Sequence, residues 1–215
     1  MKYELTSETK RIGTVVLYRI KALRSVGDCK KGDLGGWIGK ESNLSQEGNA
    51  WVSGDAQVFG DARVSGDARV FGYAWVFGYA QVYGDAWVSG NAWVFGYAQV
   101  SGNAWVSGDA QVFGDARVSG DARVSGDARV SGDAKVYGNA WVYENAWVFG
   151  DAQVYGKAQV YGKALVYGDA QVFGNTRVSG NTRVYGDAPT PNVTESDYVS
   201  ISIGGKKYRL VEVKD

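Results

Sequence analysis

Valine stands at every sixth position from Val52 to Val184 without interruption, a run of 23 valines in a chain of 215 residues. Glycine recurs in almost every one of these six-residue units. Glycine at that frequency excludes a helix, because each one would cost a helix about 1 kcal/mol. Self-similarity at a fixed period is typical of repeat architectures, so the period predicts one elongated array.

The repeated unit, written from its valine, is Val–(Ser/Phe/Tyr)–Gly–(Asp/Asn/Tyr/Lys)–Ala–(Arg/Gln/Trp). Side chains alternate in an extended segment, so the valine and the alanine two residues before it point to the same side. Glycine and Asp or Asn tolerate the left-handed backbone of a tight corner. Each hexad is therefore predicted to form a short strand and a corner. Stacked coils of three hexads would bury a Val/Ala core, at roughly 1.5–3 kcal/mol per valine before chain entropy.

This pattern resembles the hexapeptide-repeat, left-handed β-helix superfamily over residues 37–187. The resemblance implies an all-β, single-stranded, left-handed parallel β-helix with three hexads per coil and about eight coils. Departures are few: Glu144 replaces one corner glycine, Thr176 and Thr182 replace inward alanines, and no loop interrupts the run of valines. Ile38 and Leu44 form an earlier pair before a two-residue insertion. The resemblance is carried by inward Val52, Val58, Val64 and onward, and by Ala50, Ala56 and Ala62 two residues before each.

Residues 1–36 and 188–215 are predicted to be caps on the two ends of the array at 37–187. In the first cap, residues 15–20 and 22–26 are rich in β-forming residues. Pro189 and Pro191 are expected to end the array. Residues 198–203 and 206–213, separated by Gly204 and Gly205, are typical of a β-hairpin with a two-residue turn.

A narrower resemblance is carried by Gly32-Asp33-Leu34-Gly35-Gly36-Trp37-Ile38 followed by Asn43-Leu44-Ser45-Gln46. This segment is similar to the corresponding part of phage- and prophage-encoded polymer-forming hexapeptide proteins. The resemblance implies a phage-type origin more than an activity.

Charge and cysteine content give little direction toward a partner. The chain has 23 basic and 23 acidic residues, so no global field favours nucleic acid or a membrane surface. Cys29 is the single cysteine, which excludes a disulfide framework. The start of the chain lacks the apolar core of a signal peptide, and no apolar run approaches the ~18 residues of a membrane span. We therefore expect a cytoplasmic protein of a bacterial host.

With three hexads per coil, outward residues 18 positions apart would stack on one face about 4.8 Å apart. One face, which we call the aromatic face, carries a nearly continuous ladder of rings. A second, the mixed face, carries Trp interspersed with Arg, and a third, the polar face, carries Arg, Lys and Gln. Seven open rings would exceed the ~300–600 Å² apolar patch usual on a monomer. We expect a subunit interface or stacking between coils, with a ligand platform as the alternative. The densest cluster of rings is Tyr73, Trp75, Phe77, Tyr79, Trp93, Phe95 and Tyr97.

A second candidate site is a basic band formed by Arg117, Arg123, Arg129 and Lys135 in successive hexads. Aspartates at the neighbouring corners favour a solvated ring of weak ion pairs, each contributing ~0–1 kcal/mol. The alternative is anion capture, because the spacing places Arg123 between two tryptophans and Arg129 next to Trp147. A guanidinium beside an aromatic plane suits a phosphate and its base.

We expect no enzymatic activity, cofactor or metal. The resemblance implies acyltransferases or carbonic anhydrases that rely on histidine, and this chain has none. The favoured hypothesis is a phage-type binding or sequestering protein that holds a small anionic or nucleotide ligand, or a host defence protein. The alternative is a structural module that self-assembles through the aromatic face. Either version predicts a homo-oligomer, a dimer or a trimer, without membrane or nucleic-acid partners.

Overall fold

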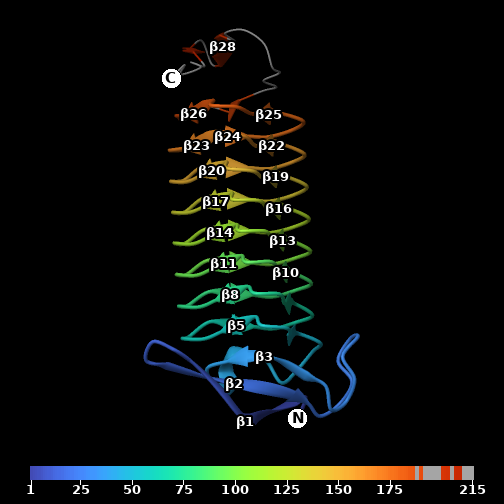
Figure 1. The fold of residues 1–215 in the computed structure, drawn as a ribbon. Helices are drawn as coiled ribbons and strands as arrows, with labels where there is room; N and C mark the ends of the chain where they lie inside the picture. Colours follow the sequence, from blue (N-terminus) through green and yellow to red (C-terminus); the bar gives the residue numbers. More distant parts are fainter. Residues whose placement is uncertain (187–188, 191–199, 204–205, 210–215) are drawn as a thin grey trace.

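The computed structural model describes residues 1–186, 189–190, 200–203 and 206–209. It is a column of stacked three-sided coils with an N-terminal cap across one end (Figure 1). Each side of the coil is a parallel sheet whose strands are mostly two residues long. The expectation of an all-β parallel solenoid with three hexads per coil is confirmed.

The three sheets are the three predicted faces, and each strand consists mainly of the residue before a valine and the valine itself. The aromatic face contains β5 (Gln57–Val58), β8 (Trp75–Val76), β11 (Trp93–Val94), β14 (Gln111–Val112), β17 (Arg129–Val130), β20 (Trp147–Val148), β23 (Leu165–Tyr167) and β26 (Arg183–Tyr185). The mixed face contains β4 (Trp51–Val52), β7 (Arg69–Val70), β10 (Trp87–Val88), β13 (Trp105–Val106), β16 (Arg123–Val124), β19 (Trp141–Val142), β22 (Gln159–Val160) and β25 (Arg177–Val178). The polar face contains β6 (Arg63–Val64), β9 (Gln81–Val82), β12 (Gln99–Val100), β15 (Arg117–Val118), β18 (Lys135–Val136), β21 (Gln153–Val154), β24 (Gln171–Val172) and β27 (Pro189–Thr190).

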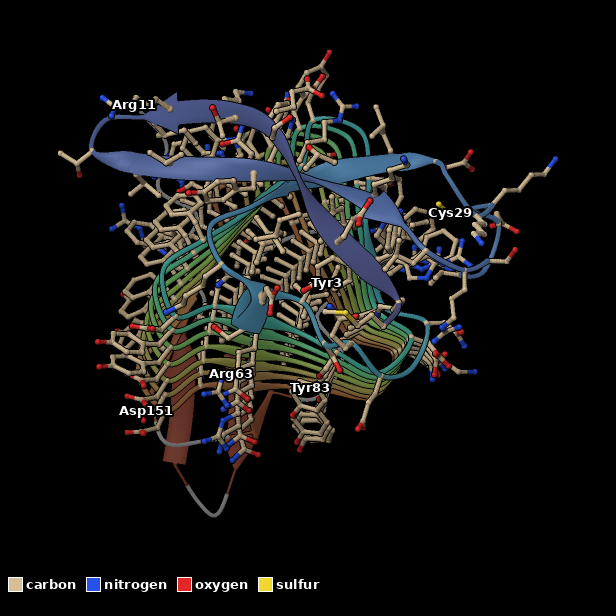
Figure 2. All side chains as sticks on the ribbon, turned by 90° about the horizontal axis from the view of Figure 1, so that it is seen from below. Tyr3, Arg11, Cys29, Arg63, Tyr83 and Asp151 are labelled. Carbon is tan, nitrogen blue, oxygen red and sulfur yellow. The ribbon has the colours of Figure 1, made fainter. Side chains whose placement is uncertain are left out.

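The sense of the coil can be followed on the polar face. Viewed from the N-terminal end, that face runs from the corner at Asp151 past Arg63 to Tyr83 (Figure 2). In this view the face lies along the lower side of the column and the chain follows it from left to right, which is a counterclockwise rotation. Because the chain also moves away from the viewer, the coil is left-handed, as the superfamily resemblance implied.

Successive coils are joined by backbone hydrogen bonds at a fixed offset. Trp75 N–H donates to the carbonyl of Ala92 at 2.9 Å and Phe77 N–H to that of Val94 at 3.0 Å, and the same pattern repeats along the array. The valines and alanines between the sheets are almost completely buried. Thr176, in an alanine position, is also buried and satisfies its hydroxyl by donating to the carbonyl of Phe173 at 2.6 Å.

The corners require glycine for two reasons. Gly108 has φ +70°, and a Cβ there would lie 2.9 Å from the nitrogen of Gly126 in the next coil. Glu144 is the one non-glycine residue with positive φ in the described part of the chain, at 58°. Its carboxylate accepts a hydrogen bond from Gly162 N–H at 2.8 Å, so the side chain closes over the following corner.

The N-terminal cap is a hairpin of β1 (Tyr3–Ile12) and β2 (Val15–Ala22), which continues antiparallel into β3 (Leu34–Ile38). β3 then pairs in parallel with β5 and so joins the cap to the aromatic face. Of the two β-rich stretches, residues 15–20 lie within β2 as predicted, whereas the stretch 22–26 does not form a strand. The second strand of the hairpin is β1, and residues 23–33 form a loop. The predicted boundary between residues 36 and 37 falls within β3.

The segment that carries the phage-type resemblance has structural roles here. A Cβ on Gly35 would lie 2.5 Å from Ile20 Cγ1, and one on Gly36 would lie 2.7 Å from Val52 Cγ1. Asn43, in the 3-10 helix η1 (Glu41–Asn43), is buried and donates to the carbonyl of Ala62 at 2.8 Å. These residues therefore attach the cap to the first coils.

The predicted two-residue insertion is present at the same place. Ile38 is the register partner of Val58, and Leu44 bridges Val64, so both partners are 20 residues apart instead of 18. Lys2 closes over the insertion, since its buried ammonium donates to the carbonyl of Ala50 at 2.7 Å.

At the other end, the array continues beyond its last valine. Pro189 begins β27 and pairs in register with Gln171 of β24, so Pro189 does not end the array as expected; Pro191 lies outside the described residues. β28 (Ser200–Ile203) and β29 (Lys206–Arg209) pair antiparallel, as the hairpin prediction required. The predicted turn at Gly204 and Gly205 and the outer residues of the predicted strands lie outside the described residues. Within the described residues, no helix is long and apolar enough to cross a membrane.

Candidate functional site

The seven rings singled out in the sequence lie together on two adjacent coils of the aromatic face, and we call them the aromatic patch: Tyr73, Trp75, Phe77, Tyr79, Trp93, Phe95 and Tyr97. β8 and β11 position them, because Trp75 and Trp93 are register partners in these strands. Phe77 lies next to Phe95, and Tyr79 next to Tyr97, because residues 18 positions apart occupy the same place on adjacent coils. Tyr79 and Tyr97 lie at one corner of the face, and Tyr73 lies at the other.

The rings of the patch form ordered columns. Trp75 and Trp93 are stacked with centroids 5.5 Å apart and an interplanar angle of 11°. Phe77 and Phe95 stack at 5.0 Å, and Tyr79 and Tyr97 at 4.9 Å. Stacked rings lose little freedom on binding, because their neighbours in the column already fix them.

The columns also contact each other sideways. Phe77 meets Trp93 edge-to-face at 6.3 Å, and Phe59 meets Trp75 in the same way at 6.0 Å. The phenylalanine column continues beyond the patch to Phe113, which stacks on Phe95 at 5.0 Å. Stacking between coils therefore accounts for one part of each ring surface, as predicted.

A large part of the ring surface is nevertheless open. Tyr73 is 63% exposed, Tyr97 58%, Tyr79 52% and Trp93 40%. Trp75, Phe77 and Phe95 are half-buried and form the floor between the corner tyrosines. The patch is thus a rigid apolar surface with phenolic hydroxyls at its edges.

The four side chains of the basic band do not point to a common place, as the side chains of an anion site would. Arg117 and Lys135 are register partners on the polar face, whereas Arg123 belongs to the mixed face and Arg129 to the aromatic face. All four side chains are exposed. The band encircles the coil as predicted, but a single small ligand can meet only Arg117 and Lys135 together. These two line a groove of about 410 Å³ in which Asp115, Asp133, Asp151 and Asp169 oppose them.

Arginine packs on an aromatic face elsewhere. The guanidinium carbon of Arg69 lies 5.6 Å from the ring centroid of Trp87 on the mixed face, and that of Arg19 lies 5.2 Å from Trp37 in the cap. Trp105 and Trp141 flank Arg123 in register on the mixed face, as the spacing predicted, and both direct their indole N–H groups to serines. Trp105 donates to Ser89 and Trp141 to Ser125, both at 3.2 Å.

The structure contains a further site that the sequence analysis missed. Loop residues 23–33 overhang the first coils of the mixed face and enclose a groove of about 660 Å³, which we call the loop groove. Trp51, Phe71 and Trp87 supply its aromatic wall, and Arg69 and Asp28 supply charge. Its lining is Val26, Asp28, Cys29, Asp33, Leu34, Asn49, Trp51, Ser53, Arg69, Phe71 and Trp87.

The loop is held against the coil by several contacts. Val26 and Cys29 exchange two backbone hydrogen bonds, at 2.9 and 3.0 Å. Arg69 Nη1 donates to the carboxylate of Asp28 at 2.8 Å, which joins the loop to β7. Gly27 has φ +56°, and a Cβ there would lie 2.8 Å from Arg69 Nη2. No local sequence signal indicates this site, because it forms between residues about 40 positions apart.

Cys29, the single cysteine of the chain, is one of the residues that line the loop groove. Burial, and then the nearby Asp33 carboxylate, raise the pKa of the Cys29 thiol, so the reactive thiolate is disfavoured. Among the described residues, no group of three or more His, Cys, Asp or Glu side chains is arranged to hold a metal ion.

The fold and its surfaces define a parallel β-solenoid built from hexads. The YdcK β-solenoid repeat matches eight segments, some of them overlapping, that together cover slightly more than half of the chain, and the protein belongs to this family. The matched segments are residues 56–70, 62–78, 80–96, 98–114, 110–126, 122–137, 158–174 and 170–186. No curated protein matches the chain significantly.

Proposed function

We propose that this chain is a non-enzymatic binding protein whose docking surface is the aromatic patch, and that a second copy of the chain covers this patch. The observation that supports the proposal is the exposure of ordered rings on one face, with Tyr73 63% and Tyr97 58% exposed. Large apolar surfaces of this kind mark interaction sites on soluble proteins.

The area of the patch fits a subunit interface. An aromatic side chain can bury roughly 150–250 Å², so seven partly exposed rings approach the ~800 Å² per partner of a standard interface. The patch contains no charged side chain, and phenolic hydroxyls at its rim can hydrogen-bond across an interface.

A second copy is the partner that the geometry favours. The aromatic face repeats by translation from coil to coil, so two copies packed face to face bring rings against rings over several coils. An isologous contact uses one patch on both subunits, and homo-oligomers of this kind are the commonest assemblies. Arg129 and Ser131 interrupt the ladder two coils from the patch and would limit sliding between the copies.

The role of such an assembly is proposed in two versions. In the first, the oligomer binds a ligand or host protein, and the phage-type resemblance of residues 32–46 suggests a nucleotide immune signal or a defence protein. In the second, the assembly itself is the function, as a rigid structural module. The dispersed basic band does not favour anion capture by Arg117, Arg123, Arg129 and Lys135 acting together.

Analytical ultracentrifugation of the Trp75→Ala/Trp93→Ala double variant tests the proposal. The wild type should sediment as an oligomer and the variant as a monomer, with an unchanged far-UV spectrum. Trp105→Ala on the mixed face is the matched control and should remain oligomeric. A monomeric wild type, or a double variant that assembles like the wild type, would contradict the proposal.

Loss of assembly can then be separated from loss of binding. If the double variant no longer assembles but still retains the small molecules or partner that copurify with the wild type, the patch is an interface only. If both are lost, ligand binding depends on the assembled face.

A further inference from the structure

The loop groove is a partly enclosed, aromatic-walled site outside the aromatic patch, and the structure assigns it a ligand class. We propose that it binds a small organic cation, with an apolar or aromatic body and one ammonium or guanidinium group. The proposal is independent of the proposed function, because the loop groove lies on the mixed face and the patch on the aromatic face.

The aromatic wall supplies the first half of this specificity. Trp51 is 7% exposed and forms the floor, while Phe71 and Trp87 meet edge-to-face at 5.8 Å and form the outer wall. Indole and phenyl faces carry negative potential and attract cations, which is how aromatic cages recognise quaternary ammonium groups. The guanidinium carbon of Arg69 lies 5.6 Å from the ring centroid of Trp87, so this wall already contacts one cation, a side chain of the protein itself.

Charge supplies the second half. Two carboxylates, Asp28 and Asp33, line the groove against one guanidinium, that of Arg69. Arg69 and Asp28 form an ion pair at 2.8 Å, and with Asp33 the three charged lining residues sum to a formal charge of −1. A cationic ligand would restore balance there, whereas an anionic ligand would meet the Asp33 carboxylate with no second cation among the lining residues.

The site is built before any ligand arrives. Asp33 Oδ2 accepts a hydrogen bond from Lys30 N–H at 2.8 Å, and this contact orients the carboxylate. The paired backbone bonds of Val26 and Cys29 close a turn within the loop, and the hydrogen bond from Arg69 to Asp28 joins that turn to β7. A groove of about 660 Å³ lies within the ~300–1,000 Å³ usual for small-ligand sites, and a preformed site avoids the entropic cost of ordering the loop.

The test is a titration of the ¹⁵N-labelled full chain with benzyltrimethylammonium, followed by the indole N–H resonances of the tryptophans. Trp51 and Trp87 signals are assigned from single Trp→Phe variants. We expect saturable shifts at these two signals and not at Trp147, and no comparable shifts with benzenesulfonate, an anion of similar size. Acetyl-arginine amide as a second probe distinguishes an arginine side chain from a free aromatic cation by relative affinity.

Asp33→Asn is the decisive variant, because asparagine keeps an oxygen for Lys30 N–H but removes the charge. We expect binding of benzyltrimethylammonium to weaken about tenfold, while Asp127→Asn, at a distant corner, leaves it unchanged. Absence of saturable shifts, equal binding of benzenesulfonate, or unchanged affinity in Asp33→Asn would each overturn the proposal. The Trp75→Ala/Trp93→Ala variant should bind the cation like the wild type, so failure here is distinguishable from failure of the docking surface.

Discussion

The indole N–H of Trp147 donates a hydrogen bond at 3.0 Å to the hydroxyl of Ser131, which lies 16 residues earlier on the preceding coil. Trp147 is the residue just before Val148, and Ser131 is the residue just after Val130, the valine of the preceding coil. From Trp75 onward, the residue 16 positions before each tryptophan is either a serine, which accepts the indole N–H, or a phenylalanine, which meets the indole ring edge-to-face. The other pairs are Trp105–Ser89, Trp141–Ser125, Trp75–Phe59, Trp87–Phe71 and Trp93–Phe77.

The Trp147–Ser131 pair predicts the effect of removing the acceptor. Ser131 is 5% exposed, so Ser131→Ala leaves the indole N–H without its partner and should lower the free energy of unfolding by about 1 kcal/mol. Ser119→Ala, which has Lys135 at the same offset, should change it by less than ~0.5 kcal/mol. Urea denaturation measures both, and equal effects would show that the offset pair contributes nothing.

Replacement of Ser131 by phenylalanine tests the same rule in the opposite direction. The array already uses Phe below Trp at three places, and a phenylalanine ring at this position would fill the gap in the column between Phe113 and Phe149. We therefore expect Ser131→Phe to fold with a stability equal to or above that of the wild type, measured as the urea midpoint. A loss of more than ~2 kcal/mol would contradict the rule, because overpacking would then outweigh ring contact.

The corner glycines predict a contrast between two identical substitutions. Gly108 and Gly168 have φ of +70° and +65°, so alanine at either position costs about 1 kcal/mol of backbone strain. A Cβ at Gly108 would also lie 2.9 Å from the nitrogen of Gly126, whereas at Gly168 the nearest atom is 3.7 Å away. Gly108→Ala should therefore lower the thermal midpoint at least twice as much as Gly168→Ala. Equal shifts of the thermal midpoint would mean that the positive φ alone sets the cost of alanine and that contact with the next coil adds nothing.

Glu144 predicts an order among three substitutions. Alanine keeps the left-handed strain at φ 58° and loses the hydrogen bond to Gly162 N–H, so Glu144→Ala should be the least stable, by about 1 kcal/mol. Glu144→Gly loses the bond but relieves the strain, and should lie between the alanine variant and the wild type. Glu144→Gln keeps an acceptor and should remain close to the wild type. Urea midpoints check the order, and an alanine variant as stable as the wild type would exclude a role for the carboxylate.

Lys2 predicts an unusual dependence of stability on pH. Burial, and then the charge of Arg24, lower the pKa of Lys2 to about 8, against 10.5 for an ordinary lysine. Between these values the unfolded chain binds more protons than the folded chain, so this group makes stability rise with pH from about 8 to 10.5. Thermal midpoints should show this rise in the wild type and a smaller one in Lys2→Met. The same slope in both proteins would contradict the assignment to Lys2.

The array was predictable because its signal is local and repeated. Val58 and Ala56 define the inward side, and the spacing of Trp75 and Trp93 defines the face they share, so the aromatic patch followed from counting. β1 was missed because Tyr3–Ile12 is mostly polar. Its pairing with β2 is local, since Ile12 pairs with Val15 across a two-residue turn that begins at Gly13 with φ 56°. The array's extension through Pro189 was missed because proline is tolerated at the first residue of a strand.

The loop groove could not be predicted from spacing. It depends on a contact between Asp28 and Arg69, which belong to different parts of the chain, and on the close approach that Gly27 permits. The spacing correctly placed Arg123 between Trp105 and Trp141. It could not report where the two indole rings turn, because the serine 16 positions before each tryptophan accepts the indole N–H. To predict where a side chain on a face points, the residue 16 positions earlier therefore has to be considered as well as the residue 18 positions away.

Native mass spectrometry of the purified chain tests the central claim most directly, because it reports the number of subunits and any retained small molecule together. We expect an oligomer that is lost in the Trp75→Ala/Trp93→Ala variant and preserved in Trp105→Ala. A wild-type protein that remains monomeric over micromolar concentrations would contradict the claim that the aromatic patch is a docking surface for a second copy.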